Sequence, residues 1–108
     1  MFIALYHWRV KTGKEGNFQE GWHQRTLEIY RQCGSLGSRL HRADDGTWFA
    51  YAQWPDRETY DAINAIPPTE NRSRKLFRES IEYAYPDVYL NVVDDLIEKL
   101  PFQKPNKA

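Results

Sequence analysis

The sequence has a single cysteine, no excess of either charge and no long apolar run. Cys33 cannot form a disulfide within the chain, which favours a reducing, cytoplasmic location. Lysine and arginine together number 15, as do aspartate and glutamate, so no net charge attracts nucleic acid or an acidic membrane. His7 and Arg9 interrupt the apolar residues at the start, which predicts a strand rather than a signal peptide, and no segment approaches membrane-spanning length. We therefore expect neither nucleic acid nor a membrane as a partner.

Motifs for metal and nucleotide binding are also missing. His7, His23 and His41 follow one another at spacings of 16 and 18 residues, which match no metal-binding pattern. The chain has no phosphate-binding loop, no dinucleotide-binding glycine pattern and no Ser-His-Asp spacing. The sequence therefore predicts no metal site.

What the chain does contain is aromatic residues, which make up 15% of it. Many lie in a strand-like segment at 2–10, whose first half is apolar on both faces, and in a hairpin-like segment at 34–54 that is apolar on both faces. In the second segment Trp48 and Trp54 lie on one face, and Phe49 and Tyr51 lie on the other. A chain of 108 residues is too short to cover a sheet twice with its own helices. The second face is therefore expected to meet a ligand or another copy of the protein.

Capping and turn residues predict the order of the elements. Thr12 and Glu15 form a capping box, so a helix is expected to begin near Gly13, and Gly34 is expected to end it in a left-handed conformation. The next elements are a hairpin with arms at 36–42 and 48–54 around Asp44-Asp45-Gly46, a helix from Asp56 to about Ala65, a helix after Pro67-Pro68 that Thr69 caps and Pro86 ends, and a strand at 88–93.

This order of strand, helix, strand, strand, helix and strand is typical of a ferredoxin-like α+β fold. Such a fold has a four-stranded antiparallel sheet with helices on one face. Because the other face is apolar here, we expect a homodimer through the sheet faces. One domain is predicted at 1–93, followed by a tail at 94–108 in which a short helix can form at 95–100.

Three segments are familiar: FIALYHWRVKTGKEGNF, GSLGSRLHRADDGTWFAYAQWPDRETYDA and VYLNVV. Together, over residues 2–93, they resemble the antibiotic biosynthesis monooxygenase family of small dimeric α+β barrel proteins. The resemblance implies a dimer whose two sheets form a barrel, with a cavity between sheet and helices in each subunit. It also implies a cofactor-independent monooxygenase that oxidises a small aromatic, quinol or polyketide-like substrate with dioxygen, with no cofactor bound.

A second function stays open beside this one. Many relatives in that family carry a histidine or tryptophan on the second helix, three residues after the aromatic that is Tyr60 here, and this chain has Ile63 there. The alternative is a non-catalytic dimeric protein of the same fold that binds a small molecule or serves in a stress response.

The candidate catalytic residues are two histidines and one tyrosine. Histidine readily exchanges a proton near neutral pH, which makes His7 and His23 candidate bases. Tyr6 lies on the more apolar face of the first strand, where a buried phenol can donate to a substrate oxygen. The candidate pocket residues, for which plain core packing is the alternative, are Trp8, Trp22, Tyr51, Trp54, Tyr60, Tyr89 and Asn91. Among them Trp22, Trp54 and Tyr60 are expected to converge.

Overall fold

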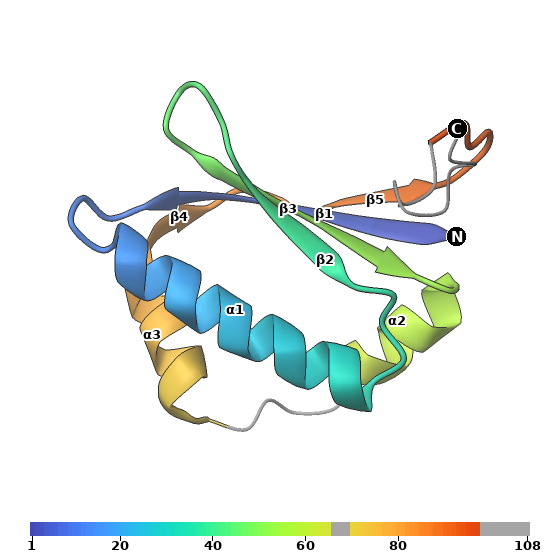
Figure 1. The fold of residues 1–108 in the computed structure, drawn as a ribbon, viewed down its shortest axis with the longest axis horizontal. Coiled ribbons are helices and arrows are strands. Elements are labelled where there is room, and N and C mark those ends of the chain that lie inside the picture. The colour runs from blue at the N-terminus through green and yellow to red at the C-terminus, as the bar shows by residue number, and fades with distance from the viewer. Residues whose placement is uncertain (66–69, 98–108) are drawn as a thin grey trace, which may run out of the picture.

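The computed structural model describes residues 1–65 and 70–97, with only the backbone described at 31 and 32. Its elements are β1 (Phe2–Val10), α1 (Glu15–Gln32), β2 (Ser38–Arg42), β3 (Trp48–Trp54), α2 (Arg57–Asn64), α3 (Arg72–Ser80), β4 (Ile81–Ala84) and β5 (Val88–Asn91). The strands form one antiparallel sheet, and the helices lie together on one of its faces (Figure 1). The predicted ferredoxin-like α+β class is therefore confirmed.

Strand β1 lies at the centre of the sheet. One of its edges pairs with β3 over Phe2–Trp8. Its other edge pairs with β5 over Phe2–Leu5 and with β4 over Trp8–Val10. Strand β2 pairs with the far edge of β3, which gives the order β2, β3, β1 and then β4 with β5.

The position of the fourth strand is shared by two short strands, which differs from the prediction. Helix α3 ends at Ser80 instead of near Pro86, and Ile81 is the first residue of β4. Proline has no backbone N–H to donate to a ladder, so the pairing with β1 is interrupted around Pro86 before β5 begins. The expectation of one strand at 88–93 was therefore wrong in its extent, because β5 ends at Asn91.

Local signals were confirmed at the second helix and at two glycines, but not at the other helix starts. The Asp56 carboxylate accepts from the Thr59 backbone N–H at 2.7 Å, as predicted for an N-cap. Gly34 and Gly46 adopt the expected positive φ values of 74° and 90°.

The Thr12 capping box was wrong. The N-cap of α1 is Lys14, and Glu15 instead accepts from the backbone N–H of Gly13 at 2.9 Å. Helix α3 is capped by Asn71, whose side chain accepts from the Arg74 backbone N–H at 2.9 Å. The predicted cap, Thr69, lies outside the described residues.

Two hydrophobic clusters fill the space between the sheet and the helices, and Tyr6 packs against both. The first consists of Phe2, Ala4, Ala52, Trp54 and Tyr60, and the second of Trp8, Phe18, Trp48 and Ala50. The strand members are the residues that alternation places on a single face of β1 and β3. The core therefore occupies one alternation face of β1 and β3.

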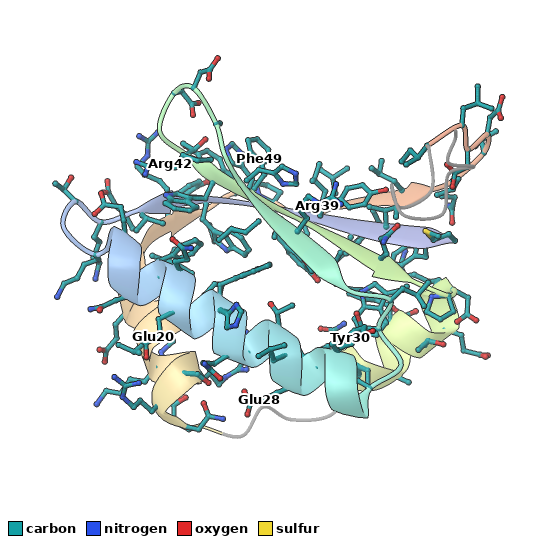
Figure 2. All side chains as sticks on the ribbon, in the orientation of Figure 1. Glu20, Glu28, Tyr30, Arg39, Arg42 and Phe49 are labelled. Atoms are coloured by element: carbon teal, nitrogen blue, oxygen red, sulfur yellow. The ribbon has the colours of Figure 1, made fainter. Side chains whose placement is uncertain are left out.

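The sheet face away from the helices is covered by no helix among the described residues (Figure 1). Figure 2 shows Phe49 and Arg39 on this side of the sheet. The strand register gives the same face the apolar or aromatic residues Ile3, Leu5, Phe49, Tyr51, Tyr83, Val88 and Leu90. We call this the open face.

Within the described ranges, no helix combines the length and apolarity needed to cross a bilayer. In the tail, residues 94–97 have no helical geometry. The rest of the short helix expected at 95–100 lies outside the described residues.

Helices α1 and α3 approach closely at Gly21. A Cβ atom built on Gly21 lies 2.7 Å from the Phe77 backbone nitrogen and 2.9 Å from the Ser73 carbonyl oxygen. Both neighbours are backbone atoms, which cannot move without shifting α3. The contact therefore requires a glycine at this position of α1.

We expect Gly21→Ala to lower the free energy of unfolding by about 1–3 kcal/mol, because the added methyl group forces the two helices apart. The matched control is Gly16→Ala on the same helix, where a Cβ meets nothing within 4 Å. That change should stabilise the protein by up to about 1 kcal/mol, since alanine is the better helix former. Urea unfolding measures both. Equal stability of the two variants would contradict the close helix contact.

Candidate functional site

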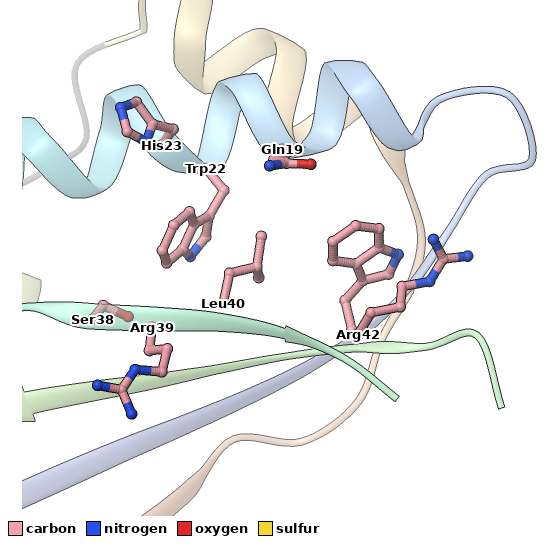
Figure 3. A pocket seen from close by; sticks show the side chains of 8 residues that line it. Gln19, Trp22, His23, Ser38, Arg39, Leu40 and Arg42 are labelled. Atoms are coloured by element: carbon pink, nitrogen blue, oxygen red, sulfur yellow. The ribbon is translucent and has the colours of Figure 1, made fainter. Parts of the chain in front are cut away.

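A groove of about 480 Å³ lies between α1 and β2, at the edge of the sheet (Figure 3). We call it the α1–β2 groove. Its lining residues are Gln19, Trp22, His23, Ser38, Arg39, Leu40, Arg42 and Trp48. Its volume falls in the range of about 300–1,000 Å³ that is usual for small-molecule sites.

The wall of the groove is apolar, and helix and strand periodicity explain why. On α1, Trp22 and His23 follow Gln19 by three and four residues, so the three side chains share one face. On β2, Leu40 points toward α1 and lies opposite Trp22 (Figure 3). Together with Trp48, these side chains give two indoles and a leucine against which a flat ring can pack.

The polar groups lie around this wall. His23 is exposed at the rim, on the helix. The Arg42 guanidinium lies over the Trp48 ring at 4.6 Å, and its Nε donates to the Gly46 carbonyl oxygen at 3.0 Å. Arg39 borders the groove, but its side chain points to the other side of β2 (Figure 3). An aromatic ligand in the groove therefore meets an imidazole and a guanidinium at its edges.

A second polar feature is a chain of phenols that links β1, α2 and β5. The Tyr6 hydroxyl lies 3.2 Å from that of Tyr60, which lies 3.2 Å from that of Tyr89. Tyr89 in turn donates to the Asp87 carboxylate at 3.4 Å. An ionised carboxylate can only accept, so the donors run in one direction, from Tyr6 through Tyr60 and Tyr89 to Asp87.

The phenols of this chain are held in their protonated form. Burial raises the pKa of Tyr6 above its ordinary value, and burial raises the pKa of Tyr60 to about 12. The hydrogen bond with Tyr60, together with partial burial, raises the pKa of Tyr89 to about 12. These groups are therefore hydrogen-bond donors at neutral pH and not bases.

His7 lies on the open face, as its alternation predicts, and not in the groove. Its ring stacks between Phe49 and Tyr85, with centroid distances of 3.8 and 4.1 Å. Its Nε2 lies 2.9 Å from the Thr47 hydroxyl, which donates to the Asp45 carboxylate at 2.6 Å. Since the hydroxyl proton is directed to Asp45, Nε2 is the donor to Thr47. The two hydrogen bonds from Thr47 also hold the pKa of Asp45 below its usual range.

The structure brings the predicted site residues together in two groups. Tyr6, Tyr60 and Tyr89 share the phenol chain, and Trp54 packs edge-on against Tyr60 at 5.5 Å. Trp22 lies with His23 in the α1–β2 groove instead. The expected convergence of Trp22 with Trp54 and Tyr60 was therefore wrong, because these residues pack into separate clusters.

The other candidates lie elsewhere. Trp8 is buried in the core, where it packs edge-on against Phe18 and Phe77 at 5.3 Å. Tyr51 lies on the open face, opposite Leu5. Asn91 is exposed at the end of β5.

Sequence reasoning missed six of the lining residues as members of one site: Gln19, Ser38, Arg39, Leu40, Arg42 and Trp48. A signal for part of this set was present. The predicted turn at 44–46 places Arg42 opposite Trp48 across the hairpin, and the structure shows that pairing. Among the described residues, no three His, Cys, Asp or Glu side chains are grouped so that they could hold a metal ion.

The architecture is that of the antibiotic biosynthesis monooxygenases of known structure. SnoaB from Streptomyces nogalater, a cofactor-independent oxygenase, matches with a TM-score of 0.71 over 90% of this chain and 97% of its own, at 17% identity. A protein from Deinococcus radiodurans assigned to these monooxygenases matches with a TM-score of 0.71 over 92% of this chain and 99% of its own, at 8% identity. Rv0793 from Mycobacterium tuberculosis matches with a TM-score of 0.69 over 89% of this chain and 98% of its own, at 11% identity. These likenesses confirm the resemblance expected from the sequence at the level of the fold.

No family model matches the sequence, and no curated protein matches it. At the identities above, a common fold does not define the reaction. The activity therefore depends on the residues of the site and not on the fold alone.

The phenol chain predicts a loss of stability in alkali. The pKa values of Tyr60 and Tyr89 are higher in the folded protein than the ordinary value of about 10. The two phenols therefore make their full contribution to the free energy of unfolding below about pH 10, and this contribution is lost as the pH rises toward 12. Between about pH 9 and about pH 11, the free energy of unfolding measured in urea should fall less for Tyr60→Phe than for the unchanged protein. Tyr30→Phe, at an exposed tyrosine of α1, should behave like the unchanged protein. Equal decreases in all three would contradict the coupled chain.

Proposed function

We propose that the protein is a cofactor-independent monooxygenase that oxidises a small aromatic, quinol or polyketide-like molecule with dioxygen in the α1–β2 groove. The observation that carries the proposal is the groove itself, where Trp22, Leu40 and Trp48 form an apolar wall with His23 at its rim. The fold shared with a cofactor-independent oxygenase supports it.

The chemistry needs little from the protein beyond binding and a base. When an electron-rich substrate such as an anthrone loses a proton from its central CH₂ group, the resulting anion can transfer an electron to dioxygen. The carbon becomes a carbonyl group, one oxygen atom enters the product and the other leaves as water. The substrate supplies all four electrons. The protein must therefore bind, orient and deprotonate it.

The groove offers residues for each of these roles. Trp22 and Leu40, which are half-buried, can pack against the substrate ring and exclude water from it. His23 is the base that accepts the proton. Tyr6 lies behind the wall, packed against the same cluster as Trp22 and Leu40, and its phenol is engaged with Tyr60. In this proposal Tyr6 positions the wall.

We also propose that a second copy of the protein covers the open face. Leu5, Phe49 and Val88 give that face an apolar surface that no described helix covers. His7 lies in the same surface, between two aromatic rings. Its role in the proposal is at the interface between the subunits and not in the groove.

We expect His23→Gln to lower kcat for anthrone oxidation by roughly 100-fold, the usual cost of losing a general base, with little change in KM. Trp22→Ala should mainly raise KM, because it removes part of the binding wall. Oxygen consumption measures the rate, and labelled dioxygen should place one oxygen atom in the product. The control is Gln24→Ala, at the exposed residue next to His23. Absence of oxygen consumption across a panel of anthrones, phenols and quinols, with the fold intact, would favour a non-catalytic binding protein.

The dimer has its own test. Phe49→Glu places a charge in the centre of the open face and should convert the dimer to a monomer, as measured by light scattering after size exclusion. Tyr30→Glu is the matched control, since Tyr30 is 54% exposed on α1, on the helical side of the sheet. It should leave the dimer intact. A monomeric unchanged protein would refute the proposed interface.

A further inference from the structure

We infer that the ligand of the α1–β2 groove is an aromatic molecule that carries an anionic group, such as a carboxylate, and that Arg42 binds this group. The inference rests on the proposed function, for which it names the substrate class. Three features of the groove support it: the charge of the lining, the free donors of Arg42 and an unsatisfied indole.

The lining of the groove is one-sided in charge. Its eight residues include no aspartate or glutamate, and its basic side chains are Arg42 and His23, since the Arg39 guanidinium points away from the groove (Figure 3). The chain as a whole has equal numbers of acidic and basic residues, so a groove without an acid is a local departure. Glu20 lines a shallower hollow beside it, but its carboxylate pairs with Arg72 at 2.8 Å. The local potential therefore favours an anion.

Arg42 is held in place and keeps its strongest donors unused. The Gly46 carbonyl and the Trp48 ring fix its position through Nε and the guanidinium face. Its two Nη groups form neither an ion pair nor a hydrogen bond within the described residues. By contrast, Arg57, Arg72 and Arg78 each pair with a carboxylate. A guanidinium with both amino groups free is suited to a planar carboxylate.

The Trp48 indole provides a second, independent observation. Trp48 is 8% exposed, and its Nε1, like that of Trp54 in the other cluster, is buried without an acceptor among the described residues. A buried donor without a partner is unfavourable, and few remain in native proteins. Arg42 covers this ring, so an anion that draws the guanidinium off the indole also makes Nε1 accessible to a ligand oxygen. One anionic group at this end of the groove would then satisfy both donors.

Arg39 provides the matched control for Arg42. It lies on the same strand three residues earlier, and its guanidinium points to the other side of β2 (Figure 3). Replacing either arginine by glutamine changes the net charge equally. Only Arg42→Gln removes donors from the groove.

The test compares the binding of 6-hydroxy-2-naphthoate with that of its neutral methyl ester, by isothermal titration calorimetry at about pH 7. The unchanged protein should bind the acid about five- to tenfold more tightly than the ester, as expected for a partly exposed charge-assisted hydrogen bond. In Arg42→Gln the two affinities should become equal, while Arg39→Gln should keep the preference. Raising the salt from about 0.02 M to about 0.5 M should reduce the preference in the unchanged protein.

Three results would overturn the inference: equal binding of acid and ester by the unchanged protein, no binding of either, or a preference that survives in Arg42→Gln. The assay measures binding alone, so its failure can be distinguished from failure of the proposed function. A preference for the acid without anthrone oxidation would support the anion site and contradict the monooxygenase function. Anthrone oxidation without the preference would support the monooxygenase function and contradict the anion site.

Discussion

Strand β1 is hydrogen-bonded along both edges, to β3 on one side and to β4 and β5 on the other. Because side chains alternate along a strand, this pairing directs Tyr6 and Trp8 toward the helices and His7 toward the open face. A shift of one residue would exchange the two sets and place His7 in the core. Both the groove and the proposed dimer surface therefore depend on the register of β1.

Much of the fold could be predicted because its signals are local. The positive φ of Gly46 and the cap at Asp56 depend on residues adjacent in sequence. The break between β4 and β5 could not be predicted in the same way, because it depends on how Pro86 meets the edge of β1. The N-cap of α3 was also missed, since both Thr69 and Asn71 are suitable residue types, and the structure gives the N-cap to Asn71.

The candidate site was predictable only in part. Aromatic richness indicated a ring-binding surface, and Trp22 and His23 were selected because of their chemistry. Which aromatics meet depends on packing between α1 and the sheet, which no local pattern specifies. Trp22 thus lies with Trp48 instead of Trp54. The predicted turn gave the pairing of Arg42 with Trp48, but the position of the guanidinium over the indole depends on side-chain packing that no local pattern specifies.

The central claim is that an aromatic ligand binds in the α1–β2 groove. The chain has four tryptophans, and each indole N–H gives its own signal in a two-dimensional ¹H–¹⁵N NMR spectrum. Titration with 6-hydroxy-2-naphthoate should shift the indole signals of Trp22 and Trp48, which line the groove, and leave that of Trp54, in the other cluster, nearly unchanged. The largest shifts at the Trp54 indole, or at the backbone amide of Phe49 on the open face, would contradict the account.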